Sequence, residues 1–219
     1  MSNLAATLQL IKDKLGKGHD LFIKSIFGQF TNVRSMVFCG GFIHHMLLRQ
    51  LECDDTSVIE FDFNGVGARF DRKAFAMITG LNCGKFPSSS ELNNLSYNLW
   101  NKYFGDEGPM TQYDFARAFE DLDFDESNDE EIKANVKCCM FYFVEMVLLP
   151  ADRARLVKKD NLMIINNEDL CKRYPWGNVC YDLTIHSLRS KMDPNKPKTA
   201  YSLYGFPLAF QVKITYSFM

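Results

Sequence analysis

Two groups of basic side chains have residue types and spacing suited to binding phosphate. Their members are Arg153, Arg155, Lys158 and Lys159 in one group, and Lys191, Lys196 and Lys198 in the other. Lys and Arg side chains that share a surface neutralise several phosphates together, and the resulting affinity falls as salt is added. The sequence therefore predicts nucleic-acid-binding residues at these seven positions, with an ordinary solvated basic face as the alternative.

A strongly acidic stretch precedes the first basic group. Residues 106–131 contain 11 Asp or Glu and 1 Arg. Asp121, Asp123 and Asp125 have the 1-3-5 spacing of a calcium-binding EF-hand loop, but Glu126 occupies the position of the turn Gly and Ile132 that of the bidentate Glu. We therefore predict a solvated acidic loop and no metal site. The stretch could instead face a basic protein partner, or orient a polyanion away from its side of the molecule.

The residue pattern gives little support to catalysis. Cys83 precedes Gly84, as a thiol nucleophile can, but no recognised signature surrounds it or any of the four His. The sequence Asn64–Gly67 lacks the further Gly or Lys of a phosphate-binding loop and instead has the Asn-Gly of a hairpin turn. We predict a non-catalytic protein with no cofactor and no small-molecule substrate. A cryptic thiol enzyme that uses Cys83 or Cys171 is the remaining enzymatic alternative.

The elements that hold these side chains are predicted to be mainly helical. The 219 residues are 47% apolar and 14% aromatic, with 19 Phe and a net charge of −2, which excludes disordered, collagen-like and uniformly basic proteins. Val58–Phe63 and Ala68–Phe70 flank the Asn-Gly turn and predict a short β-hairpin, with Ile59 and Phe61 on one face. We predict a mainly α (α+β) fold, a single helical domain with a small β-hairpin.

Apolar spacing and capping residues predict where the helices lie. The predicted helices include residues 4–15, 22–30, 36–51, 72–79, 92–103, 132–149 and 179–192. Asp71 and Thr111 are expected to cap helices at their N-termini, and Pro150 to end the most apolar helix, which we place at the centre of the core. The pattern of Tyr201–Met219 is ambiguous between helix and strand.

Cysteine usage and the lack of targeting segments indicate the compartment. The seven Cys are odd in number and include no C-x-x-C pair, so we predict reduced thiols in an intracellular protein. The N-terminus does not have the pattern of a secretory signal. The longest apolar stretch, Cys138–Leu149, is interrupted by Glu145 and is shorter than the about 20 residues that a membrane span needs. We expect a soluble protein without a membrane partner.

Three segments, in order along the chain, resemble the elements of one plant domain of unknown function. Phe75–Gly84, with the sequence FAMITGLNCG, resembles its "F-A-hydrophobic-hydrophobic-T-G-L-x-C-G" element. Tyr174–Gly177, which reads YPWG, is similar to its "PWG" element, and the sequence GFPLAFQ that ends at Gln211 is similar to its closing "GFP-L-A-x-Q" element. Members of that family stand N-terminal to Ulp-type SUMO-protease domains in proteins that Mutator-like transposable elements have spread.

The resemblance implies a nuclear, transposon-related plant protein whose protease chemistry belongs to a later domain. It also implies a family core, which we place at residues 36–219; apolar spacing predicts an N-terminal helical segment at residues 1–35, which we expect to form one globular unit with the core. Related transposon proteins include anti-silencing factors that recognise element DNA. DNA or chromatin association is therefore the leading expectation, and interaction with a basic protein partner is the second.

Overall fold

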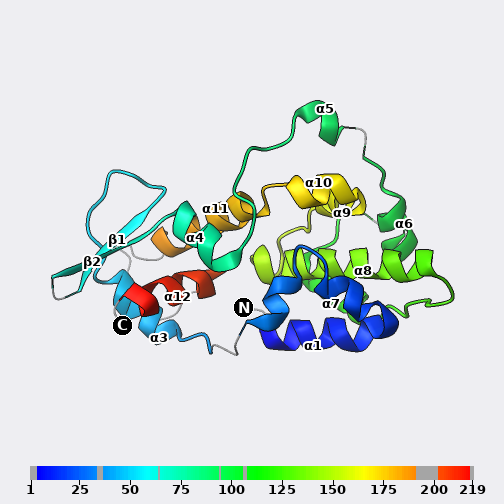
Figure 1. The fold of residues 1–219 in the computed structure, drawn as a ribbon, viewed down its shortest axis with the longest axis horizontal. Coiled ribbons are helices and arrows are strands. Elements are labelled where there is room, and N and C mark those ends of the chain that lie inside the picture. Colours follow the sequence, from blue (N-terminus) through cyan, green and yellow to red (C-terminus); the bar gives the residue numbers. More distant parts are fainter. Residues whose placement is uncertain are drawn as a thin grey trace. The chain divides into compact units, whose positions relative to one another are not determined.

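The chain is mainly helical, with one two-stranded antiparallel hairpin (Figure 1), as the sequence predicts. The computed structural model describes residues 4–33, 37–63, 65–93, 95–105, 108–190 and 202–217. These residues belong to two compact units, each assembled from stretches far apart in the sequence. The first unit lies within residues 35–83 and 175–219, and the second within residues 2–34 and 84–174.

The hairpin of the first unit has the predicted turn and the predicted faces. Strands β1 (Ile59–Phe63) and β2 (Val66–Phe70) pair so that Phe63 lies opposite Val66, and Gly65 has the positive φ of 83° that the turn requires. Ile59 and Phe61 are buried, whereas Asp62 is exposed. The alternation of apolar and polar residues therefore directs one face of the hairpin into the core.

Four helices among the described residues complete the core of the first unit. They are α3 (Gly40–Leu47), α4 (Arg72–Thr79), α11 (Trp176–Arg189) and α12 (Pro207–Ser217). The ring of Phe210 in α12 lies 5.3 Å from that of Phe61 and 5.2 Å from that of Phe70. Asp71 caps α4 by accepting the N–H of Ala74 at 2.8 Å, which confirms the predicted cap. The C-terminal segment, ambiguous in sequence, is helical from Pro207 to Ser217.

The segments that carry the family resemblance meet inside this unit. The N–H of Gly177 donates to the carbonyl oxygen of Asn82 at 2.8 Å, and the N–H of Phe206 donates to Oγ1 of Thr184 at 2.8 Å. Gln211 accepts the N–H of Cys39 at 2.8 Å. Trp176 is buried, as a core anchor is. These elements therefore hold the fold together rather than forming an exposed site.

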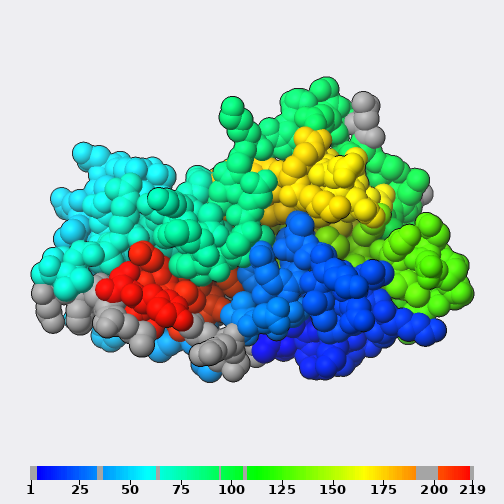
Figure 2. All heavy atoms as spheres, viewed as in Figure 1, coloured from blue at the N-terminus to red at the C-terminus, as the bar shows by residue number. Residues whose placement is uncertain are grey.

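The second unit is built around α8 (Asp129–Phe143), the longest helix of the described residues. Its regular elements are α1 (Leu4–Leu15), η1 (Gly16–Gly18), α2 (His19–Ile23), η2 (Gly28–Asn32), α5 (Ser89–Leu92), α6 (Asn98–Phe104), α7 (Gln112–Glu120), α8 (Asp129–Phe143), η3 (Val144–Leu148), α9 (Lys159–Asn166) and α10 (Glu168–Arg173). Helix α8 is buried along its second half, and Phe22, Phe27 and Phe30 pack around its last residue, Phe143. In Figure 2 the blue residues 4–33 form a continuous surface with green residues of this unit.

Several predicted helices are shorter or divided. The prediction of one helix over 92–103 is wrong. Ser88 and Glu91 form a capping box that starts α5, and a second helix, α6, begins at Asn98. The predicted helix over 22–30 is replaced by the end of α2 and the 3₁₀ turn η2. The predicted helix 132–149 ends in the π-helical turn η3. Within the described ranges, no helix is both long and apolar enough to cross a bilayer.

Candidate nucleic-acid interface

The first basic group lies on a segment that the backbone holds against the start of α7. The N–H of Gln112 donates to the carbonyl of Arg155 at 2.8 Å, and that of Tyr113 to the carbonyl of Arg153 at 3.2 Å. The N–H of Val157 donates in return to the carbonyl of Met110 at 2.9 Å. These bonds fix the backbone of residues 153–157, although it lies outside the helices. We call residues 153–159, which include Lys158 and Lys159, the basic segment.

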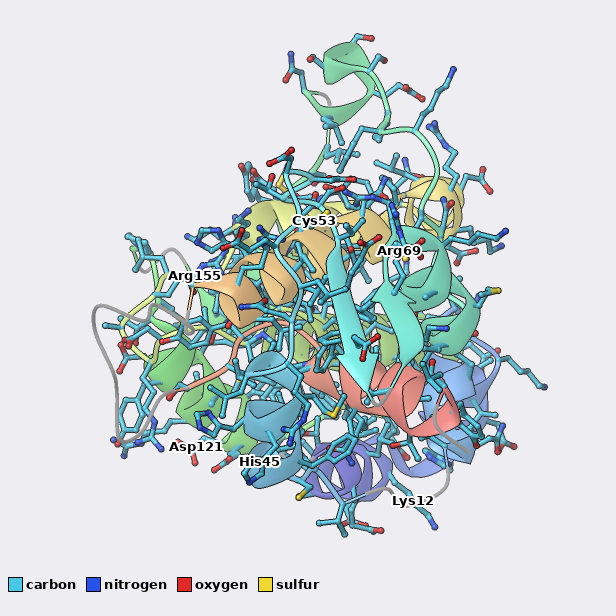
Figure 3. The ribbon with its side chains drawn as sticks, turned by 90° about the vertical axis from the view of Figure 1, so that its left-hand side faces the viewer. Lys12, His45, Cys53, Arg69, Asp121 and Arg155 are labelled. Atoms are coloured by element: carbon cyan, nitrogen blue, oxygen red, sulfur yellow. The ribbon has the colours of Figure 1, made fainter. Side chains whose placement is uncertain are left out.

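The side chains of the basic segment are open to solvent to different degrees. Arg153 and Lys158 are exposed, whereas Arg155 (labelled in Figure 3) and Lys159 are half-buried. The ammonium of Lys159 lies 4.4 Å from the ring centroid of Trp100, at cation–π distance. Among the residues that the structure describes, Arg153, Arg155 and Lys158 form no ion pair with a carboxylate. The charges of the exposed Arg153 and Lys158 are thus available to an external anion.

The second basic group lies outside the described residues. Lys191, Lys196 and Lys198 all belong to the stretch 191–201. The site that can be built from the structure therefore consists of the basic segment and its surroundings in the second unit.

A buried carboxylate lies beneath the basic segment. Glu145, in the π-helical turn η3, is only 3% exposed, and its Oε1 accepts the side-chain N–H of Asn161 at 2.6 Å. Burial raises the pKa of Glu145 to about 7, against the opposing effects of the Asn161 hydrogen bond, the positive charge of Arg155 and the N–H of Lys158. Arg155 and Lys158 therefore act on Glu145 from the basic segment, and Asn161 acts on it from α9.

Gln112 connects the same carboxylate-bearing turn to the start of α7. Its side-chain amide donates to the carbonyls of Glu145 at 3.0 Å and Leu149 at 3.1 Å, and its Oε1 accepts the N–H of Ala151 at 2.9 Å. The sequence reasoning did not single out Gln112 or Asn161. The one signal in the sequence was Glu145 itself, a charged residue within an otherwise apolar stretch.

Acidic residues surround the site but do not neutralise it. Asp114 lies in the first turn of α7, and Asp152 and Asp160 flank the basic segment. The hydroxyl of Tyr97 donates to Asp160 at 3.2 Å. The acidic loop that starts at Asp121 follows the other end of α7, a helix about 13 Å long, and charges in water are screened over about 8 Å at physiological salt. That loop therefore has little effect on the potential at the basic segment.

The thiols and possible metal ligands offer no comparable site. Burial raises the pKa of the Cys83 thiol, whereas an activated nucleophile needs a lowered one. Cys171 is buried. Over the described residues, no three His, Cys, Asp or Glu side chains are placed so that they could hold a metal ion. The cryptic thiol enzyme thus gains no support from the geometry.

Comparison with protein families gives one match. A family model described as "Domain of unknown function (DUF1985)" matches residues 47–187. The match includes the basic segment, Gln112 and Glu145, and leaves out α1 and α12. No curated protein and no solved structure matches the chain.

Proposed function

Because the chain belongs to the DUF1985 family of domains of unknown function, whose description assigns no activity, we propose a function from the site itself. The chain is a non-catalytic module that binds nucleic acid, as DNA or chromatin, through the basic segment. The observation that supports this most directly is the position of Arg153 and Lys158. They are exposed, form no ion pair within the described residues and stand on a backbone that is fixed by hydrogen bonds.

The sequence resemblance supplies the biological setting of this proposal. A plant domain that precedes Ulp-type SUMO-protease domains in transposon-related proteins would act in the nucleus. The DNA of transposable elements is a polyanionic ligand present there. In this setting the module targets its protein to DNA, and a neighbouring domain supplies the chemistry. Lys191, Lys196 and Lys198 are proposed as additional phosphate contacts.

The proposal predicts binding that depends on salt and on two side chains. The double variant Arg153→Glu, Lys158→Glu should bind a labelled DNA duplex more weakly than the wild-type chain at low salt. Each lost phosphate contact lowers the slope of log affinity against log salt by about 0.9, so the double variant should reduce that slope by about 2. Fluorescence anisotropy titrations at several salt concentrations measure both quantities. We reverse Arg153 rather than Arg155 because Arg155 acts on the buried Glu145.

A matched control has the same total charge as the double variant, but its two charge reversals lie away from the basic segment in the sequence. Lys12→Glu with Lys24→Glu reverses two exposed lysines on α1 and just after α2. This control should leave the affinity and the slope close to those of the wild type. Absence of wild-type binding to DNA at low salt, both duplex and single-stranded, or equal weakening by both double variants, would contradict the proposal.

The exposed carboxylates of the acidic loop favour a second candidate function. Asp121, Asp123 and Asp125 are exposed, and a basic protein segment such as a histone tail has the complementary charge. In this alternative the chain is a protein-interaction module. Binding of a basic peptide that disappears when these three Asp are changed to Asn, but persists in the Arg153 and Lys158 double variant, would favour it over nucleic-acid binding.

A further inference from the structure

Exposed aromatic side chains lie near both ends of the basic segment. Tyr113 is 48% exposed, and its backbone N–H donates to the carbonyl of Arg153. Tyr97 is 46% exposed, and its hydroxyl donates to Asp160, the residue after Lys159. Leu156, between them in the segment, is also 48% exposed. Cations alternating with open aromatic faces are the arrangement that binds the backbone and the bases of an unpaired strand at the same time.

Tyr113 is held rigidly enough to act as a stacking platform. It is the second residue of α7, whose first turn is capped by Thr111 through the N–H of Asp114 at 3.1 Å. One turn further along, the guanidinium of Arg117 lies 5.9 Å from the Tyr113 ring centroid. Arg117 is the one basic residue of the stretch 106–131. The ring therefore lies beside one cation of α7, on a residue whose backbone is hydrogen-bonded to the basic segment.

The local charge is positive but modest. Arg117 and the four cations of the basic segment, counted with Asp114, Asp152 and Asp160, carry a net charge of +2. The first N–H groups of α7 donate to the carbonyls of Arg155 and Arg153, so the helix N-terminus does not bind a phosphate itself. Phosphate contacts alone therefore give weak binding. Stacking of a base on an aromatic ring can then supply a large share of the binding free energy.

We infer that this surface binds single-stranded nucleic acid, with a base stacked on Tyr113 and phosphates contacting Arg153 and Lys158. The inference rests on the proposed function and narrows it to one class of ligand. The bases of an intact duplex stack on each other, whereas those of a single strand are free to stack on a side chain. The basic segment spans at most about 20 Å, so the footprint on the strand is a few nucleotides.

The experiment compares ligands and variants in one titration format. The whole 219-residue chain is titrated into labelled 15-nucleotide oligo-dT, oligo-rU and a 15-base-pair DNA duplex, and fluorescence anisotropy is recorded. The variants are Tyr113→Ala, Tyr113→Phe and, as a matched control, Tyr216→Ala, an exposed tyrosine of α12 in the first unit. Unlabelled poly-glutamate is the competitor that tests for a general polyanion site. Thermal melts followed by circular dichroism verify that each variant is folded.

We expect a single strand to bind more tightly than the duplex, and the tighter of the DNA and RNA strands identifies the natural chemistry. Tyr113→Ala should weaken single-strand binding at least about fivefold, the effect of about 1 kcal/mol of stacking, while Tyr113→Phe and Tyr216→Ala stay within about twofold of wild type. Duplex binding as tight as single-strand binding, or equal competition by poly-glutamate, would overturn this inference and leave nucleic-acid or polyanion binding standing. Binding of neither strand nor duplex would remove the proposed function as well.

Discussion

At the residue scale, the fold raises the pKa of Glu145, a carboxyl group that lies beneath the basic segment. It is buried, receives the amide of Asn161, and lies under the segment that carries Arg153 and Lys158. Its pKa of about 7 in the folded chain compares with 4.5 for an ordinary Glu. Between these two values the folded chain binds a proton that the unfolded chain releases, so stability falls as the pH rises from about 4.5 to about 7 and is constant above.

Glu145→Gln should remove this pH dependence, because the amide keeps the shape and one acceptor oxygen without the charge. The stability of Glu145→Gln relative to wild type should therefore increase by about 3 kcal/mol between pH 4.5 and pH 8. Urea unfolding of both proteins at several pH values measures the difference. Glu120→Gln, at the exposed end of α7, is the control for the same change of residue outside the buried turn. A difference between Glu145→Gln and wild type that does not vary with pH would contradict the raised pKa of Glu145.

At the element scale, the junction of α4 and α11 depends on a close approach that only Gly permits. A Cβ added at Gly177 would lie 2.5 Å from Sγ of Cys83 and 2.8 Å from the carbonyl oxygen of Asn82. Gly177→Ala should therefore force these segments apart and destabilise the chain by about 1–3 kcal/mol, or at least about 2 °C in melting temperature. Gly41→Ala, in α3 where an added Cβ would meet nothing within 4 Å, should be neutral or slightly stabilising. Equal melting temperatures for the two variants would refute this packing explanation.

The elements that could be predicted are those whose signals are local. The hairpin, the Asp71 cap and the Thr111 cap each depend on residues close to one another in the sequence, and all three are present. Helix α9 was not predicted, because its apolar run, Leu162–Ile165, is too short to distinguish a helix from a strand. The capping box of Ser88 and Glu91 starts a short helix of its own before α6, and apolar periodicity alone does not predict that start.

In the candidate site, too, only features with local signals could be predicted from the sequence. The charges of Arg153 to Lys159 are visible in the sequence, but the contacts that fix them are not. Gln112 lies 33 positions from Glu145, and Asn161 lies 16 positions from it. Only the tertiary fold brings an amide donor from α7 and another from α9 to one turn. Gln112 and Asn161 therefore had no sequence signal beyond their polarity.

At the scale of the whole molecule, both units depend on segments outside the family match at residues 47–187. In the second unit, Phe22, Phe27 and Phe30 from the N-terminal region cover Phe143. In the first unit, Phe210 from α12 covers the inner face of the hairpin. Each of these side chains is nearly fully buried, and burying one large apolar side chain stabilises a fold by roughly 1.5–3 kcal/mol. The loss of four such residues is comparable with the whole stability of a typical domain.

A fragment limited to residues 47–187 should therefore fail to fold, even though it spans the family match. Circular dichroism should show reduced helicity without a cooperative melt, and the amide region of its ¹H–¹⁵N spectrum should be poorly dispersed. A fragment of residues 4–217 keeps every described contact and should melt like the full chain. A cooperative melt of the 47–187 fragment at the temperature of the full chain would mean that the aromatic contacts from both ends contribute little. In that case the core that stabilises the molecule lies within the matched residues alone.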